Sequence, residues 1–146
     1  MIKTAANLRW LSQIGLLAML GLLLLATGCC PYTKGILADV STSTTMSKAD
    51  SFEYLQRWFD DSGYKIWQQD AAKGYVRAST LRQSGSGEVE DVLAATLSDT
   101  GGKVKVEIQA ETYSTEGRRQ KIKVSDQAKQ DMNSIKAALA RGGVGG

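Results

Sequence analysis

Between Lys103 and Glu111, apolar and polar residues alternate without interruption. Val104, Val106, Ile108 and Ala110 share one parity, and lysine, glutamate and glutamine fill the other. Successive side chains of a strand point to opposite faces, so this alternation predicts a strand with one buried face and one face in water. Such a strand needs neighbouring strands and a covering layer, which restricts the chain to a sheet packed on one face.

Helical periodicity flanks the strand-forming region on both sides. Ser47 precedes apolar residues at helical spacing and Gly63 follows them, which predicts a helix over about 48–62. Ser125 precedes a second apolar stripe at the same spacing, formed by Ala128, Met132, Ile135 and Leu139. Two amphipathic helices are therefore expected to cover the apolar face of the sheet.

Several more strands are expected between the two helices, separated by turn residues. The segments are 64–69, 75–81, 89–97, 103–111 and the shorter 120–124. The predicted fold class is α+β, a two-layer sandwich in which two helices cover one face of an antiparallel sheet of four to five strands, in the order αββββ(β)α. Ile36, Leu37 and Val40 leave open a further short strand before the first helix.

The first 28 residues have the composition of a targeting segment. Lys3 and Arg9 form a basic start without acidic residues, and an apolar run extends from Ile14 to Ala26. Without these two residues, 16 of the 18 basic residues remain against 15 acidic ones. The remainder is nearly neutral, which argues against nucleic acid as a partner, because phosphate binding needs a concentrated basic surface.

The segment Leu25-Ala26-Thr27-Gly28-Cys29 resembles the lipobox of bacterial lipoproteins. The resemblance implies cleavage between Gly28 and Cys29, with diacylglycerol and a fatty acyl group on Cys29. Several acyl chains on one residue anchor a protein stably. A plain secreted protein and an uncleaved membrane span are the alternatives. Cys30 is then an idle thiol or an intermolecular cross-link, and by resemblance a residue other than aspartate after Cys29 implies the outer membrane.

The remaining chain divides into three parts. Residues 29–46 are expected to form the lipidated N-terminus and a flexible tether, because they are rich in serine and threonine. Residues 47–141 are expected to form one α+β domain. The glycine-rich residues 142–146 are expected to be disordered.

The side chains of this sequence offer little for catalysis. The chain has no histidine, and both cysteines lie at the proposed anchor, so no catalytic residue, metal site or dissociable cofactor is expected. Glu107 and Glu111 lie about 13 Å apart along one strand, which is far for a glycosidase pair. The acidic residues Glu88, Glu90 and Asp91 are expected to be solvated.

Two features predict a contact surface. Trp67 and Tyr113 are expected on the open sheet face, where exposed aromatic residues often mark contact sites. Four basic residues follow Gly117: Arg118, Arg119, Lys121 and Lys123. The alternatives are that Trp67 packs at a sheet edge and that the basic residues protect an edge strand from aggregation.

The run from Trp58 to Ile66, followed by Asp70 and Gly74-Tyr75-Val76, is similar to a pattern in BamC-like lipoprotein domains. That resemblance implies a helix-grip fold and a place in the outer-membrane assembly machinery. The expected function is a non-catalytic, lipid-anchored periplasmic binding or assembly accessory at the bacterial outer membrane, with an envelope protein as partner. A carboxylate-dependent cell-wall enzyme and a carrier of small apolar ligands are the alternatives.

Overall fold

The computed structural model describes residues 37–85 and 87–142. Over these residues the chain forms six strands and two helices: β1 (Ala38–Thr44), α2 (Lys48–Asp61), β2 (Lys65–Asp70), β3 (Tyr75–Ser84), β4 (Gly87–Thr100), β5 (Lys103–Ser114), β6 (Gln120–Ile122) and α3 (Asp126–Ala140). Neither helix in this part of the chain is long and apolar enough to cross a membrane. The predicted signal segment, Cys29, Cys30 and residues 143–146 lie outside the described residues.

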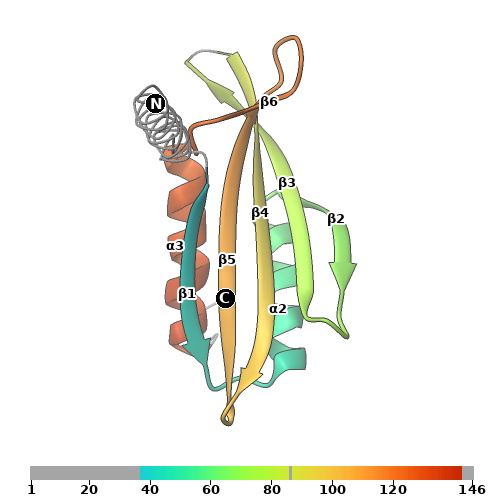
Figure 1. The fold of residues 1–146 in the computed structure, drawn as a ribbon, viewed down its shortest axis with the longest axis vertical. Coiled ribbons are helices and arrows are strands. Elements are labelled where there is room, and N and C mark those ends of the chain that lie inside the picture. Colours follow the sequence, from blue (N-terminus) through green and yellow to red (C-terminus); the bar gives the residue numbers. More distant parts are fainter. Residues whose placement is uncertain (1–36, 86, 143–146) are drawn as a thin grey trace, which may run out of the picture. The chain divides into compact units, whose positions relative to one another are not determined.

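The strands form one antiparallel sheet in the order β1-β5-β4-β3-β2, and β6 pairs with the end of β5 (Figure 1). The turn between β4 and β5 lies at one end of this sheet. The tip of the β3–β4 hairpin and the connection from β5 to β6 lie at the other end (Figure 1). We call the end with the β3–β4 tip the hairpin-tip end.

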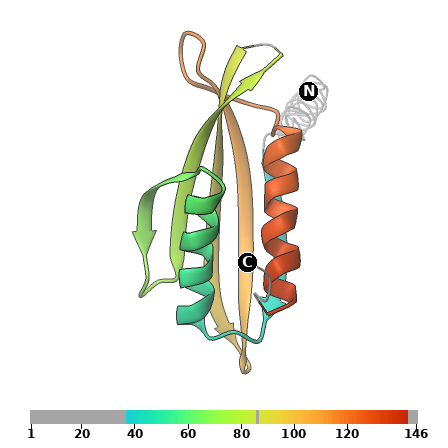
Figure 2. The same cartoon turned by 180° about the vertical axis from the view of Figure 1, so that it is seen from behind.

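Both helices lie on the same face of the sheet (Figure 2). Ser47 and Ser125 cap them, and each serine oxygen accepts a hydrogen bond from the backbone N–H three residues later. The buried face of α3 is the stripe expected from the sequence, and α2 buries Phe52, Leu55 and Phe59. The helix expected over 48–62 is thus confirmed to within a residue at each end, and the helix expected after Ser125 is confirmed as α3.

The alternation in β5 is confirmed residue by residue. Val104, Val106, Ile108 and Ala110 are buried beneath the helices, and the residues between them face the open side. Leu93, Ala95 and Leu97 extend the same apolar layer on β4. The core is therefore a single layer of side chains between one sheet face and two helices.

The prediction that residues 29–46 form a flexible tether is wrong for the second half of this segment, because Ala38–Thr44 form strand β1, which pairs with β5. The sheet has six strands rather than four or five, and one of them precedes the first helix. Ala38 and Val40 pack against the core, and Thr44 is buried. A segment rich in serine and threonine forms a strand here because the β-branched side chains of Val40, Thr42 and Thr44 fit a pleated edge and α3 covers its inner face.

Candidate functional site

The sheet face opposite the helices carries a group of interacting aromatic and charged side chains. Outward positions on neighbouring strands meet in register, so that Glu90 lies beside Tyr113 and Val92 lies beside Glu111. We use the name open-face cluster for this group: Trp67, Arg77, Glu90, Glu111, Tyr113, Arg119 and Lys121.

Trp67 reaches this face through a β-bulge. The pairing of β2 with β3 passes from Ile66–Ala78 to Gln68–Arg77, which leaves Trp67 as the extra residue. The Trp67 side chain is 51% exposed, and the Arg77 guanidinium carbon lies 4.8 Å from its ring centre. Bulges often redirect a side chain in this way. The bulge gives the open face an aromatic ring with a cation stacked on it.

Tyr113 forms a second stack of the same kind. The Arg119 guanidinium carbon lies 3.6 Å from the Tyr113 ring centre, and the Lys121 ammonium lies 5.9 Å from it. Arg119 Nε also lies 2.8 Å from a carboxylate oxygen of Glu90, and this hydrogen bond raises the pKa of Arg119. Both arginines of the cluster thus stack on an aromatic side chain.

Glu111 joins the two stacks. Its carboxylate accepts hydrogen bonds from Arg77 at 2.9 Å and from the Tyr113 hydroxyl at 2.8 Å, and it also pairs with Lys121. Burial alone would raise the pKa of Glu111, but the hydrogen bonds from Lys121 and Tyr113 and the charge of Arg77 outweigh it and lower that pKa. Glu111 is therefore held as a carboxylate at the centre of the cluster.

The structure brings together four of the six residues predicted as a contact surface, namely Trp67, Tyr113, Arg119 and Lys121. Arg118 and Lys123 are exposed and lie outside the cluster. Sequence reasoning missed Arg77, Glu90 and Glu111 as members of this surface. The signal for Arg77 was its parity in the strand 75–81, because inward Val76 and Ala78 leave it facing outward.

The expectation that Asp91 is solvated is wrong. Asp91 lies on the sheet face that the helices cover, and its side chain is 0% exposed. It accepts hydrogen bonds from Thr112 Oγ1 at 2.6 Å and from Ser125 Oγ at 2.8 Å, and Arg82 Nε lies 3.3 Å away. Ser125 is the N-cap of α3. Asp91 therefore fixes the start of this helix onto β4 and β5.

Arg82 extends this network to Asp131 of α3 and to Tyr64, which lies between α2 and β2. It pairs with Asp131 at 2.6 Å and donates to the Tyr64 hydroxyl at 3.3 Å, and that hydroxyl donates to Asp131 at 2.7 Å. Burial and the hydrogen bond to Asp131 raise the pKa of Tyr64. Three elements are cross-linked by charge here, so we interpret the network as structural.

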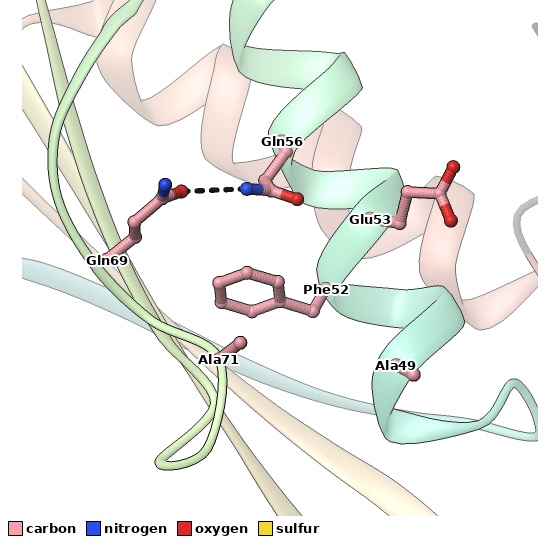
Figure 3. A pocket seen from close by; sticks show the side chains of 6 residues that line it. All are labelled: Ala49, Phe52, Glu53, Gln56, Gln69 and Ala71. Atoms are coloured by element: carbon pink, nitrogen blue, oxygen red, sulfur yellow. Dashed lines mark hydrogen bonds between the residues drawn. The ribbon is translucent and has the colours of Figure 1, made fainter.

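A groove of about 550 Å³ lies between α2 and β2 (Figure 3). Phe52 and Ala71 form its apolar part, and Gln56 Nε2 donates across it to Gln69 Oε1 at 2.7 Å (Figure 3). The carrier alternative calls for a cavity between the sheet and the helices. Core side chains occupy that space, and this groove lies at the sheet edge instead.

Three acidic residues of the open face are paired with cations. Glu90 pairs with Arg119, Glu107 with Lys105, and Glu111 with two cations. A lowered pKa does not suit Glu111 to the role of a general acid near neutral pH. Over residues 37–85 and 87–142, no group of three or more histidine, cysteine, aspartate or glutamate side chains is arranged to hold a metal ion.

No protein-family model matches the chain, and no curated protein matches it. Among solved structures, Ara h 8.0201 has a TM-score of 0.48 at 12% identity, over 73% of this chain and 92% of its own. A DUF4468 family protein from Bacteroides ovatus has a TM-score of 0.38 at 17% identity, over 80% and 78%. A TBP-like protein from Parabacteroides distasonis has a TM-score of 0.37 at 14% identity, over 65% and 70%. Because every TM-score is below 0.5, none of these likenesses supports an argument about this chain.

Proposed function

We propose that the chain is a lipid-anchored binding or assembly accessory on the periplasmic side of the bacterial outer membrane, without a catalytic role. Cys29 carries the lipid, and the open-face cluster contacts an envelope protein. The observation that supports the contact surface best is the pair of arginine–aromatic stacks joined by Glu111.

The physical argument rests on preorganisation. A flexible arginine loses side-chain entropy when it is fixed at an interface, and a stack that already fixes it lowers this cost. Aromatic residues and arginine are also the side chains that contribute most to binding at protein interfaces. On the open face these residues are fixed and still partly exposed to solvent.

The contact surface is tested by co-purification after cross-linking in intact cells. We expect Trp67→Ala and Arg119→Glu each to reduce the recovered partner by about tenfold, because each removes one stack. Lys105→Glu is the matched control, since Lys105 points to the same face from β5 but pairs with Glu107 outside the cluster. Unchanged recovery with Arg119→Glu, or equal loss with Lys105→Glu, contradicts the assignment.

The anchor is tested separately by fractionation. Cys29→Ser should move the protein from the membrane fraction to the soluble periplasmic fraction, and mass spectrometry of the N-terminus should find acylation on Cys29 only in the unsubstituted protein. A Cys29→Ser protein that stays in the membrane fraction with an intact leader contradicts the anchor.

The groove between α2 and β2 favours a second candidate function, the binding of a small apolar ligand. Its volume of about 550 Å³ lies within the usual range of ligand sites, and an apolar floor with amides at the rim is typical of such sites. Ala49→Trp should fill the groove. If a fatty acid or another apolar probe binds the unsubstituted protein and not this variant, the carrier function gains support over the open-face proposal.

A further inference from the structure

The first strand shortens the distance between the proposed lipid and the folded part. Leu37 is the first described residue, and Ala38 already belongs to β1. Leu37 follows Cys29 by eight positions in the sequence. A chain of this length spans at most about 28 Å, whatever its conformation. The start of β1 is therefore held close to any membrane in which Cys29 is anchored.

The start of β1 lies toward the hairpin-tip end of the sheet. Ala38 pairs with Ala110, whereas Thr44 pairs with Val104, so β1 runs away from this end. Tyr113 lies three residues beyond Ala110 on β5, which is about 10 Å along the strand, and Lys121 of β6 pairs with it. The chain thus joins the sheet near the part of the open-face cluster that contains Tyr113, Arg119 and Lys121.

The charges of the hairpin-tip end do not favour binding to anionic lipid. The segments 84–90 and 111–123 together contain four basic and four acidic residues. Two of the basic residues are neutralised directly, because Arg119 pairs with Glu90 and Lys121 pairs with Glu111. Attraction to anionic head groups requires a surplus of basic residues. A protein in the same membrane suits this surface better than the bilayer itself.

We propose that the domain presents its hairpin-tip end to the bilayer and that the open-face cluster contacts a protein embedded in or anchored to the same membrane. The proposal rests on the lipid anchor at Cys29. It deepens the proposed function because it places the contact immediately beside the membrane and names a membrane protein as the partner.

Two serines at opposite ends of the same hairpin test the orientation. Ser84 ends β3 and pairs with Gly87, and Ser98 lies eleven residues further along β4, so the two positions are about 37 Å apart. Both side chains are exposed. In a Cys30→Ser background, Ser84→Cys and Ser98→Cys each provide one thiol for a fluorophore on the lipidated full chain.

The labelled proteins are reconstituted in vesicles of phosphatidylethanolamine and phosphatidylglycerol with a nitroxide quencher on the head groups. We expect at least twofold stronger quenching at position 84 than at position 98. Equal quenching, or stronger quenching at position 98, overturns the orientation. Flotation of the same vesicles separates the two levels of failure: a chain that does not float contradicts the anchor, whereas a chain that floats with equal quenching contradicts only the orientation.

The partner class is tested with a photo-cross-linking amino acid at Leu81 or at Thr96. Both positions face the open side, but Leu81 lies beside Glu90 toward the hairpin tip and Thr96 lies beside Glu107. We expect Leu81 alone to give a product in which mass spectrometry identifies an integral or lipid-anchored membrane protein as the partner, and this product should disappear with Cys29→Ser. A product with phospholipid, with a soluble protein, or from Thr96 alone overturns the partner class.

Discussion

Glu90 and Asp91 are adjacent acids in one strand, but the two faces of the sheet give them different roles. Glu90 points to the open face and pairs with Arg119, which is 52% exposed. Asp91 points beneath the helices and is shielded from solvent, where Thr112, Ser125 and Arg82 satisfy its carboxylate. A charge on an exposed face contributes little to stability, whereas a buried charge is costly unless its partners remain.

Asp91→Ala should therefore destabilise the fold far more than Glu90→Ala. Removal of the buried carboxylate leaves the Thr112 and Ser125 hydroxyl donors without their acceptor and takes away one of the two carboxylates that face Arg82, and we expect a loss of about 3 kcal/mol. Glu90→Ala should cost less than about 1 kcal/mol. Urea unfolding followed by tryptophan fluorescence measures both values. Similar midpoints for the two variants would contradict the structural role of Asp91.

The lowered pKa of Glu111 predicts that the ion pairs of the open face stabilise the fold less in acid. The pKa of Glu111 in the folded state is lowered from the ordinary value of 4.5, so its ion pairs add stability above about pH 4.5 and lose it as the pH falls through the folded-state pKa. Between pH 5 and pH 3, Glu111→Gln should flatten the decline in unfolding free energy relative to the unsubstituted chain. Glu107→Gln is the control on the same strand. If both variants keep the full decline, Glu111 does not contribute to it.

At the scale of elements, the β2–β3 hairpin is joined to its neighbours at the turn before Tyr75. Gly74 C=O accepts a hydrogen bond from Leu97 N–H at 2.8 Å, and Lys48 Nζ donates to Ala72 C=O at 3.1 Å. Gly74 has a φ of 69°. These contacts fix the hairpin that carries Trp67.

Gly74→Ala should cost more than the same change at Gly63. Both glycines have positive φ, which an alanine adopts at a cost of about 1 kcal/mol. A Cβ at Gly74 would lie 2.7 Å from the Leu97 carbonyl oxygen, whereas a Cβ at Gly63 has nothing within 4 Å. We expect losses of about 3 kcal/mol at Gly74 and about 1 kcal/mol at Gly63 from urea unfolding. Equal losses would show that the turn relaxes away from β4.

The elements that could be predicted are those with an unambiguous period or cap. The alternation in 103–111 and the capped stripes after Ser47 and Ser125 depend on local spacing, and the structure reproduces them. β1 was only an open alternative, because its stability comes from β5 and α3, which lie far away in the sequence. The serine and threonine run 41–45, which includes the end of β1, therefore resembles a linker in the sequence.

The candidate site could be predicted only in part, for a related reason. Parity alone placed Trp67 and Tyr113 on the open face. The same parity puts Asp91 with Leu93 and Leu97 on the inner face, but a carboxylate there was not expected because its partners are not local. Glu111 became the centre of the cluster through Arg77, which is 34 residues away. Contacts of this kind follow from strand register, which periodicity does not determine.

At the scale of the whole molecule, β1 completes the layer under α3. It pairs with β5 over its full length, from Ala38–Ala110 to Thr44–Val104, and α3 packs across both strands. Without it, β5 would become a sheet edge with unpaired backbone groups. A domain limited to residues 47–141, as expected from the sequence, would therefore lack the strand that borders its core beside β5.

A chain that begins at Ser47 should consequently fail to fold cooperatively, whereas a chain that begins at Lys34 should fold. The described residues lie in one compact unit, and a start at Ser47 removes the seven residues that pair with β5, among them the partners of Val106 and Ile108. We expect the shorter chain to aggregate or to lose its urea transition, because β5 then exposes its edge. Size-exclusion chromatography and urea unfolding of the two chains provide the measurement. Equal midpoints and equal elution as monomers would contradict the role of β1, and would mean that α3 and β4 alone hold β5 in place.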